Sequence, residues 1–446
     1  MKDLIMAKKI AEKVREKGGR TFFVGGFVRD KLLKKENKDI DIEIHNITPQ
    51  DLREVLSELG TITEMGASFG ILGLKGYDID IAQPRSEMAN GRGHKDFEIF
   101  VDPFIGTKNA AKRRDFTINA LMEDVLTGEI IDHFNGLNDL NKGIIRHINN
   151  ETFIEDPLRV FRAPQFAARF GFSIANETIE LSKTMDLTFL PKERVLEEMK
   201  KALLKSNKPS IFFEELRKMN QLKDWFPELE ALIDVPQNPI YHPEGDVWNH
   251  TMMVLDNAAL LKNETMEPFW FMITALTHDF GKAITTKEVN GVIRSLEHEI
   301  KGLPLVEKFL DRISTEVKLK EYVLNLTKLH MKPNQLVASK SKKKVTNKMF
   351  DEAIDCKGLL LLAKSDHLGR KNAKDYNNEE KFLTERLKWY EETMKQPEVM
   401  GRDLIKAGLK PGPYFTELLI LAHKLHLANV DKKSALAQVL AEAKKY

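Results

Sequence analysis

The 446-residue chain has a single cysteine, Cys356, and no long hydrophobic run. One cysteine excludes an internal disulfide and any zinc site built from several thiolates, so metal ions must be bound by histidines and carboxylates. Apolar runs such as Gly358 to Ala363 are much shorter than the roughly 20 residues that cross a bilayer. Because the N-terminus also carries charges in place of a signal-peptide core, we expect a cytoplasmic protein without a membrane segment.

A strong charge of either sign is also missing, since 69 Lys and Arg residues nearly balance 67 Asp and Glu residues. The net charge of +2 neither requires nor excludes a polyanionic partner, so only local groups of cations can indicate one. The densest group lies within residues 340–344, where four lysines occur. Such runs occur on nucleic-acid-binding surfaces and, more often, on plain solvated faces.

The hydrophobic pattern divides the chain into a mixed α/β part and a long helical part. Strands are predicted where short segments are apolar or alternate in polarity, at 21–24, 39–44, 71–74 and 77–82. Segments with helical spacing lie between them, and after about residue 117 the patterns are mainly helical. Three prolines within 234–243 interrupt the helices and predict a domain boundary.

Two aspartates stand two apart in Asp39-Ile40-Asp41. On a strand both carboxylates project from one face, while the isoleucines anchor the other. Two carboxylates and substrate phosphates commonly hold Mg²⁺, and a pair of such ions activates a hydroxyl and neutralises leaving pyrophosphate. The pattern therefore indicates phosphoryl transfer, although a polar edge strand carries the same pattern. Asp80 is a candidate third acid, for which a structural role is equally open.

A glycine pair, Gly25-Gly26, follows the first predicted strand and precedes a predicted helix. Glycines at such a place let backbone amides approach phosphate oxygens, and Arg29 adds a cation nearby. The order of strand, glycine pair, helix and acid-bearing strand indicates a nucleotide site. Arg113 and Arg114 are further cations suited to triphosphate or sugar contacts.

These motifs resemble those of the class II nucleotidyltransferases, which include tRNA CCA-adding enzymes and bacterial poly(A) polymerases. Gly25 to Asp30 with Asp39-x-Asp41 resembles one family motif, Arg113 to Leu121 matches the second nearly letter for letter, and Asn135 to Leu140 is similar to the third. The resemblance implies a polymerase-β-like head with catalytic Asp39 and Asp41 binding Mg²⁺. The nucleotide-binding residues that it implies are Gly25, Gly26, Arg29, Arg113, Arg114, Asn119, Asp156, Arg159 and Arg162.

The segment from Glu155 to Arg162 is expected to open a helix, because acids and a proline suit a first helical turn. On that helix Asp156, Arg159 and Arg162 would share one side. A carboxylate accepts from the exocyclic amino group that cytosine and adenine carry, whereas guanine and uracil present a carbonyl there. The resemblance implies that Asp156 and Arg159 act as a protein template for C and then A.

Two residues after this motif depart from the family pattern. Gln165 stands where the family usually has a second arginine, and Pro164 lies in the interior of the predicted helix, which predicts a local kink and an altered grip on the triphosphate. The segment from Glu193 to Glu198 resembles the fifth family motif. A plain charged helix explains that segment equally well, so we assign it no chemistry.

A His278-Asp279 doublet ends an apolar helix predicted at 269–276. Imidazole and carboxylate are the ligands expected of a hydrolytic metal site when thiolates are absent. With other histidines and acids around it, the doublet resembles the HD phosphohydrolase superfamily. The ligands that the resemblance implies for a divalent transition metal ion of unknown identity are His250, His278, Asp279 and Asp366. His298 and His330 are candidates for a second ion or for phosphate contacts, and each, like His242, is as readily an ordinary histidine.

We therefore expect an α+β fold, with a mixed-sheet head followed by helical parts. The predicted divisions are a nucleotidyltransferase head at 1–148, an all-α neck at 149–235, an HD domain at 236–372 and a helical tail at 373–446. The expected function is addition of CCA to tRNA from CTP and ATP, with an HD-domain phosphatase or phosphodiesterase activity. The oligomeric state is left open.

Three alternatives stay open. A poly(A) polymerase is disfavoured because the strands at 71–74 and 78–82 follow closely, without the arginine-rich insertion that we associate with those enzymes. An enzyme that adds only CC or only A is disfavoured because residues 87–96 resemble the flexible loop of full CCA-adding enzymes. A catalytically inactive RNA- or nucleotide-binding protein would not need two aligned carboxylates that repel RNA without a cation between them.

Overall fold

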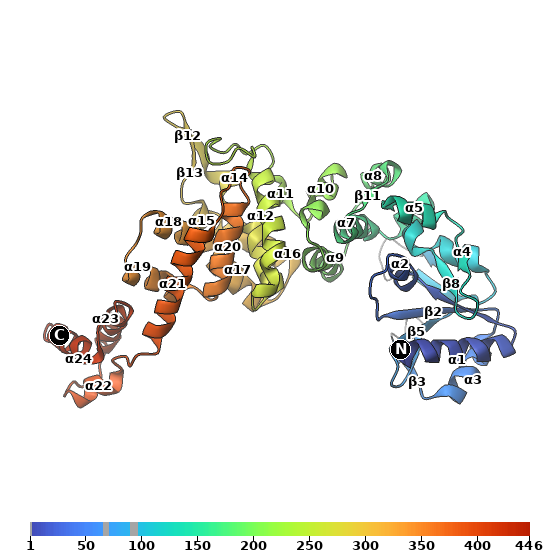
Figure 1. Cartoon of the computed structure of the whole chain (residues 1–446), viewed down its shortest axis with the longest axis horizontal. Helices are drawn as coiled ribbons and strands as arrows, with labels where there is room; N and C mark the ends of the chain where they lie inside the picture. Colours follow the sequence, from blue (N-terminus) through green and yellow to red (C-terminus); the bar gives the residue numbers. More distant parts are fainter. Residues whose placement is uncertain (1, 66–70, 90–96) are drawn as a thin grey trace. The chain divides into compact units, whose positions relative to one another are not determined.

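The computed structural model describes residues 2–65, 71–89 and 97–446, and the chain forms two compact units. Unit 1 comprises Met1–Ala202 and Ile211–Trp225, and unit 2 comprises Leu203–Ser210 and Phe226–Tyr446 (Figure 1). The division between units thus falls before the proline-rich segment at 234–243, where we had expected a boundary. Unit 1 combines the predicted head with most of the predicted neck.

A mixed seven-stranded sheet forms the centre of unit 1, with the order β3-β4-β5-β2-β1-β8-β9. Only β2 and β5 pair in parallel, and the other neighbours are antiparallel. The strands are β1 (Arg20–Val24), β2 (Ile40–His45), β3 (Ile62–Met65), β4 (Ile71–Leu74), β5 (Ile79–Ala82), β8 (Met122–Asp124) and β9 (Ile130–Ile131). The four strands predicted from the sequence are β1, β2, β4 and β5.

Helices surround this sheet and continue after it (Figure 1). They are α1 (Lys2–Glu16), α2 (Gly26–Leu32), α3 (Pro49–Leu59), α4 (Thr107–Lys112), η1 (Thr117–Asn119), α5 (Gly136–Lys142), α6 (Asn150–Glu155), α7 (Arg159–Phe170), α8 (Asn176–Ser182), α9 (Lys192–Lys205) and α10 (Ser210–Lys218). Helix α1 packs on β1 and α3, because its apolar residues Met6, Ile10 and Val14 recur at helical spacing and are buried.

Two short sheets complete unit 1. Strands β6 (Arg85–Ala89) and β7 (Phe97–Val101) pair antiparallel, and β10 (Ile144–Ile145) pairs in parallel with β11 (Ser173–Ile174). The predicted flexible loop overlaps the end of β6 and stops before β7, and its residues 90–96 lie outside the described residues.

Unit 2 is almost entirely helical. Its elements up to the predicted tail are α11 (Pro227–Glu230), α12 (Val247–Leu261), η2 (Lys262–Glu264), α13 (Pro268–Thr277), α14 (Lys282–Thr285), β12 (Thr286–Val289), β13 (Val292–Ser295), α15 (His298–Lys301), α16 (Leu303–Ile313), α17 (Val317–Leu329), α18 (Lys332–Ala338), α19 (Lys343–Glu352) and α20 (Cys356–Leu368). Helices α12, α13, α17 and α20 pack on one another, which places the apolar α13 at the centre of the unit. The hairpin β12–β13 was not expected.

The last helices contain a hydrophobic cluster of their own. They are α21 (Asn377–Met394), α22 (Gly401–Lys406), α23 (Phe415–Leu427) and α24 (Lys432–Ala443). Leu404, Leu418 and Val439 are fully buried in the cluster that joins α22, α23 and α24.

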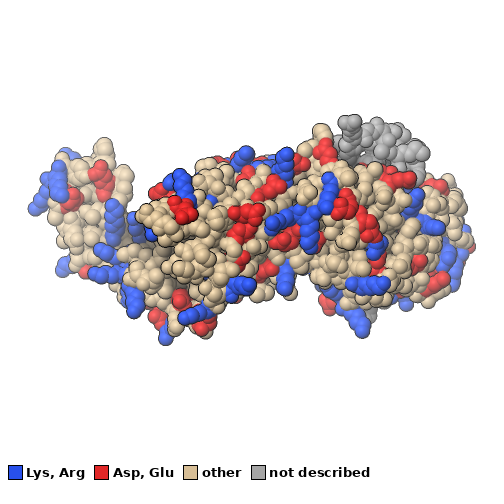
Figure 2. Space-filling view, turned by 90° about the horizontal axis from the view of Figure 1, so that it is seen from above, with Lys and Arg blue, Asp and Glu red and all other residues tan. Residues whose placement is uncertain are grey.

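No described helix combines the length and the apolar character needed to span a membrane. On the face of the molecule drawn in Figure 2, basic and acidic side chains are interspersed. This distribution agrees with the small net charge of the sequence.

Candidate functional site

Three aspartates lie at the start of two neighbouring strands of unit 1. Asp39 directly precedes β2, and Asp41 on β2 is in parallel register with Asp80 on β5. Burial raises the pKa of Asp41 to about 6, with further contributions from the charges of Asp80 and Asp39 that Arg114 partly opposes. A carboxylate group that resists ionisation in this way is short of positive charge, so a divalent cation fits the site. Asp80 thus lies beside the predicted pair.

The predicted glycine turn lies at the same place. Gly25 has φ +64°, and a Cβ atom added there would lie 3.0 Å from Arg114 Nη1 and 4.0 Å from Asp41 Oδ2. Gly26 is the first residue of α2. The structure therefore brings together a backbone turn suited to anions, a guanidinium and the carboxylates, as the motifs predicted.

Glu43 is a site residue that the sequence reasoning missed. It continues the alternation of Asp39 and Asp41 along β2, and its carboxylate is 2% exposed. Its Oε1 is 2.9 Å from His45 Nε2, and its Oε2 accepts from Arg113 at 3.3 Å and Arg114 at 3.4 Å. Burial alone would raise the pKa of Glu43, but these partners lower it to about 2. Glu43 is therefore a buried anion that holds Arg113 and Arg114, the two arginines predicted to contact the triphosphate.

Three other predicted nucleotide-binding residues belong to a polar network centred on Asp115. Arg29 is 3% exposed and donates to Asn119 Oδ1 at 2.6 Å, and Asn119 donates to Asp115 at 2.9 Å. Arg162 donates to the other Asp115 oxygen at 2.8 Å. Arg29 also pairs with Asp30, so its guanidinium is buried inside the network. It lies beside the glycine turn as well, because a Cβ atom added to Gly26 would be 3.4 Å from Arg29 Nη2.

Replacement of Asp115 by asparagine should destabilise unit 1 by about 3 kcal/mol at pH 7. This is the lower end for a broken buried ion pair, because Arg162 is 31% exposed. Burial opposes ionisation of Asp115, but Arg162 and Asn119 lower its pKa. The charged form therefore stabilises the fold above the unfolded pKa of 3.8, and this contribution is lost as the pH falls through the lower folded value.

Hydrogen exchange of the β1 and β8 amides can measure this change. Protection should fall in Asp115→Asn at pH 7, with a smaller difference in acid. Glu180→Gln, which changes an exposed carboxylate of the same unit, serves as the control. Equal protection in Asp115→Asn and the parent protein at pH 7 would show that the network does not stabilise the unit.

The predicted template helix differs from its expected form. Helix α6 ends at Glu155 and α7 begins at Arg159, so Asp156 lies in an extended link and not on the helix. Pro157 follows it and disfavours helical backbone at residue 156, which explains the break. Asp156 accepts from the Leu158 N–H two residues later at 3.2 Å, a local turn that aspartates commonly form.

Side chains at this link and at the start of α7 nevertheless contact the surrounding site residues. Arg159 donates to the carbonyls of Thr152 at 2.6 Å and Arg113 at 2.7 Å, which joins the predicted base reader to the triphosphate arginines. Asp156 pairs with Arg194 at 3.2 Å. Arg194 lies in the segment that resembles the fifth family motif, to which we assigned no chemistry. That resemblance was the sequence signal that could have identified Arg194 as a site residue.

The two departures from the family pattern lie within α7. The helix runs continuously from Arg159 to Phe170 with Pro164 inside it, so the proline does not break the helix. Gln165 is 1% exposed, and its Nε2 has no hydrogen-bond partner in the described part of the chain. Gln165 therefore faces the interior of unit 1.

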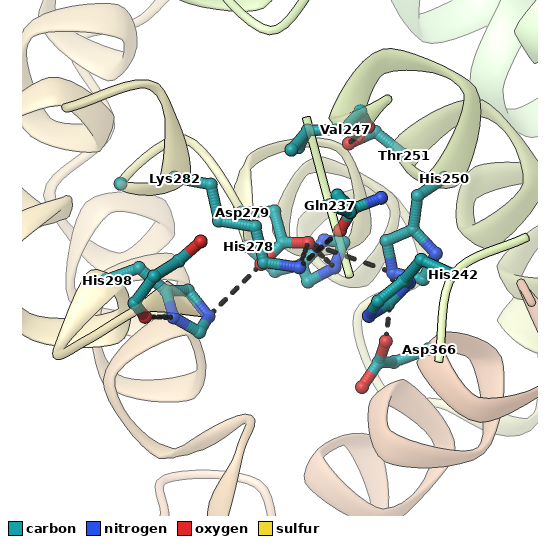
Figure 3. Close-up of polar contacts among 12 residues, drawn as sticks. Gln237, His242, Val247, His250, Thr251, His278, Asp279, Lys282, His298 and Asp366 are labelled. Carbon is teal, nitrogen blue, oxygen red and sulfur yellow. Dashed lines mark hydrogen bonds and ion pairs between the residues drawn. The ribbon is translucent and has the colours of Figure 1, made fainter. Parts of the chain in front are cut away.

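Unit 2 gathers the predicted HD ligands into one buried cluster (Figure 3). His250 Nε2 lies 3.0 Å from Asp366 Oδ1 and 3.7 Å from Asp279 Oδ2. His278 Nε2 lies 3.3 Å from Asp279 Oδ2. Each of these four side chains is 7% exposed or less. The structure thus brings together all four predicted ligands, from α12, the end of α13 and α20.

The two additional histidines, His298 and His330, lie near the other carboxylate oxygen of Asp279. His298 Nε2 is 3.2 Å and His330 Nε2 is 3.8 Å from Asp279 Oδ1, and the two Nε2 atoms are 3.3 Å apart. Burial and the neighbouring histidines lower the pKa of His330 to about 3, so this ring is neutral and able to bind a cation. His250, His278 and Asp279 form one set whose ligand atoms lie within 4.8 Å of one another, and Asp279, His298 and His330 form a second.

A cavity of about 610 Å³ opens onto this cluster. Lys282 in the cavity wall lies 2.7 Å from Asp279 Oδ2 and donates to Gln237 at 2.9 Å (Figure 3). Its ammonium group therefore forms an ion pair with the buried carboxylate. Arg294 and Arg370 also line the cavity. Burial opposes ionisation of Asp279, but Lys282 and the histidines hold its pKa well below the usual range. The arrangement combines metal-ligand chemistry with cations that suit a phosphate.

The head carboxylates are more widely spaced than this cluster. Among the described residues, the sets of His, Cys, Asp and Glu with ligand atoms within 4.8 Å of one another all lie in unit 2. The third of these sets contains His242, Glu244 and His250. His242 therefore lies at the cluster, and Glu244 is a member that the sequence reasoning missed.

Comparison with known proteins identifies the relatives of the chain. The model of the poly A polymerase head domain matches residues 21–146, and that of the probable RNA and SrmB-binding site of polymerase A matches residues 171–233. Among solved structures, a CCA-adding enzyme in an apo form matches with a TM-score of 0.69 at 21% identity, covering 99% of this chain and 96% of that one. The Thermotoga maritima CCA-adding enzyme complexed with tRNA matches with a TM-score of 0.64 at 21% identity, covering 98% and 95%. These structures show a shared fold.

The sequence relationship is closer. A multifunctional CCA protein of Acinetobacter baumannii is 36% identical over 328 residues, which are 72% of this chain and 76% of that protein. The matched region is long enough in both proteins to establish common descent of the nucleotidyltransferase. The chain belongs to the family of multifunctional CCA proteins, tRNA nucleotidyltransferases built on the poly(A) polymerase head domain.

Proposed function

We propose that this protein adds C, C and A to the 3′ ends of tRNA from CTP and ATP, without a nucleic-acid template. The observation that carries this proposal is the position of Asp41 beside Asp80, Gly25 and Arg114. It combines a carboxylate group that fits divalent cations with an anion-binding turn, which is the minimum that nucleotidyl transfer needs. Membership of the family supports the same reaction. A cytoplasmic location is part of the proposal.

The residues divide the work of the transfer. Asp39 and Asp41, with Asp80 beside them, would hold Mg²⁺. A bound divalent ion stabilises the charge on the attacking hydroxyl and on the leaving pyrophosphate. Arg114 is held by Glu43 next to the glycine turn, where it would contact the triphosphate. The RNA 3′ hydroxyl loses its proton to solvent, and its oxygen forms a bond to the α-phosphorus. The bond to the bridging oxygen breaks, and pyrophosphate leaves with that electron pair.

Labelled nucleotides can test this function directly. Purified protein is incubated with Mg²⁺, tRNA that lacks its 3′ CCA, and each labelled nucleotide singly and in combination. We expect incorporation of C, then of A, and none of G or U. Runs of A without prior C would indicate a poly(A) polymerase, addition of only C or only A a partial enzyme, and no incorporation an inactive binding protein.

Replacement of Asp156 by asparagine should relax the choice of nucleotide. An asparagine both donates and accepts, so it no longer rejects the carbonyl of uracil as a carboxylate does. Selectivity for C over U should fall by about 1–3 kcal/mol, or roughly 5- to 150-fold. Competition between CTP and UTP on tRNA lacking CCA measures this ratio. The exposed Asp224→Asn in the same unit should keep the parental ratio, and an unchanged ratio in Asp156→Asn would remove Asp156 from base selection.

The cluster in unit 2 supports a second activity, hydrolysis of phosphate esters with divalent transition metal ions. His250, His278, Asp279 and Asp366 would hold one ion, and Asp279, His298 and His330 would hold another. The buried His278 Nε2 has no hydrogen-bond partner among the described residues, which fits a ring nitrogen that ligates a cation. Such an ion lowers the pKa of a bound water and polarises a phosphoryl oxygen.

Three cations on the cavity wall suit the phosphate of the substrate. Lys282, Arg294 and Arg370 line the same cavity as the ligands. The Arg370 Nε atom is buried and has no hydrogen-bond partner in the described part of the chain. A phosphate oxygen would satisfy this donor, and the Arg370 guanidinium would orient the ester toward Asp279.

A further inference from the structure

The ligand histidines of unit 2 differ in what holds their Nδ1 atoms. His278, His298 and His330 each direct Nδ1 to a backbone carbonyl three residues earlier, at 2.8 Å, 2.9 Å and 2.6 Å. A carbonyl only accepts, so Nδ1 carries the proton in these three rings. Nε2 of each ring then points toward Asp279 and is the nitrogen that would bind a metal ion.

His250 is held differently. The carbonyl three residues earlier, that of Val247, accepts from the Thr251 hydroxyl at 2.8 Å (Figure 3). His250 Nδ1 instead lies 3.0 Å from Glu244 Oε1, a carboxylate that is 2% exposed. Its Nε2 faces a second carboxylate, that of Asp366, at 3.0 Å. His250 is therefore the ligand whose tautomer depends on a side chain that can be replaced.

Glu244 is itself held from several directions. The same Oε1 atom lies 2.8 Å from His242 Nδ1, and Oε2 accepts from the Lys371 N–H at 3.2 Å. Gly245, with φ +108°, turns the chain between Glu244 and the start of α12. A buried carboxylate with three donors around it has little freedom to move, so it acts as a rigid acceptor.

We propose that Glu244 is the positioning residue of the HD metal cluster. It accepts from the Nδ1 atoms of both His250 and His242. His250 Nε2, which faces Asp366 and Asp279, is thereby left as the nitrogen that would bind a metal ion. His242 is held against the wall of the cavity by the same atom. The inference rests on the proposed metal binding of this cluster.

Cobalt binding by the full-length protein tests this role without any enzymatic assay. We choose an Asp41→Ala background, because this change removes the head site as a competing ion site. Co²⁺ is titrated against a chelator, and its visible absorption reports the ligand set. Glu244→Gln should weaken Co²⁺ binding about 10- to 100-fold, as loss of a partner of a metal-bound histidine does elsewhere. The absorption bands should also change, because His250 ligates poorly.

The glutamine amide explains the expected loss. If its oxygen faces the two rings, its NH₂ group opposes the Lys371 N–H, and if its NH₂ faces the rings, it donates to Nδ1 and moves the His250 proton to Nε2. Glu228→Gln is the matched control, since Glu228 is a buried carboxylate of the same unit that pairs with Arg312 at 2.6 Å. This control should bind Co²⁺ as the Asp41→Ala parent does.

The outcomes separate the inference from the function on which it rests. No Co²⁺ binding to the Asp41→Ala parent would overturn metal binding by the cluster itself. Tight binding in the parent and equal affinity in Glu244→Gln would overturn only the role of Glu244. Should Glu244→Gln fail to fold, Glu244→Asp decides, because its shorter side chain keeps the charge but cannot reach both rings. Parental affinity in Glu244→Asp would then refute the proposal, and a weakened affinity with altered bands would support it.

Discussion

Replacement of Asp41 by alanine should reduce nucleotide incorporation on the order of a thousandfold, while hydrolysis of phosphate esters by unit 2 is unchanged. Asp41 is two residues from Asp39 and in parallel register with Asp80, and burial and those two neighbours raise its pKa to about 6. Its removal takes away the central ligand of the Mg²⁺ position. Metal stabilisation of the transferred charge is worth several kcal/mol, and about 4 kcal/mol corresponds to a thousandfold.

The measurement is single-turnover addition of labelled C to tRNA lacking CCA. Glu12→Ala, which changes an exposed residue of α1, is the control for substitution as such. Asp41→Asn provides a second variant with nearly the parental shape, and it should be impaired to a similar extent because the charge is lost. Incorporation at the parental rate in either Asp41 variant would contradict the catalytic site as described.

Replacement of Asp279 by alanine should have the complementary effect. Asp279 contributes both carboxylate oxygens to the cluster, with His250 and His278 near one and His298 and His330 near the other. Its loss therefore removes a ligand that both ion positions share. Hydrolysis of phosphate esters, including a terminal cyclic phosphate, should fall on the order of a thousandfold, again because metal activation is worth several kcal/mol.

Addition of C and A should continue at the parental rate in this variant, because the head site shares no residue with the cluster. Asp279→Asn keeps the shape of the side chain and should lose the hydrolytic activity as well. Metal content of both variants, measured on the purified protein, should be lower than in the parent. Full hydrolysis by Asp279→Asn with reduced metal content would exclude metal-dependent chemistry at this cluster.

Much of the head could be predicted because its signals are local. Alternation with a period of two places Asp39, Asp41 and Glu43 on one side of a strand whatever the rest of the chain does. Two glycines before a helix likewise specify a turn. The same reasoning failed at Asp156, where the spacing of three suggested one helix face. Pro157 constrains the backbone of the preceding residue, and the helix begins only at Arg159.

The pairing of acids and bases could not be predicted from spacing. Glu43 and Arg113 are 70 residues apart, and Arg162 meets Asp115 over 47 residues. Local patterns carry no information on such distances, because every buried charge competes for several possible partners and the packing of the helices decides among them. Arg29 illustrates this, since the spacing placed a cation beside the glycine turn but did not show that Asp30 and Asn119 would be its partners.

In unit 2 the sequence by itself determined which chemical groups were present: with one cysteine in the chain, histidines and carboxylates were the available metal ligands. It also placed His278 and Asp279 together at a helix end. Only the tertiary structure decided that Asp366, 116 residues after His250, lies 3.0 Å from it, and that Glu244 takes the Nδ1 side of that ring. The physical reason is that ring tautomers and ion positions depend on which acceptors surround each nitrogen, and only the folded chain defines these surroundings.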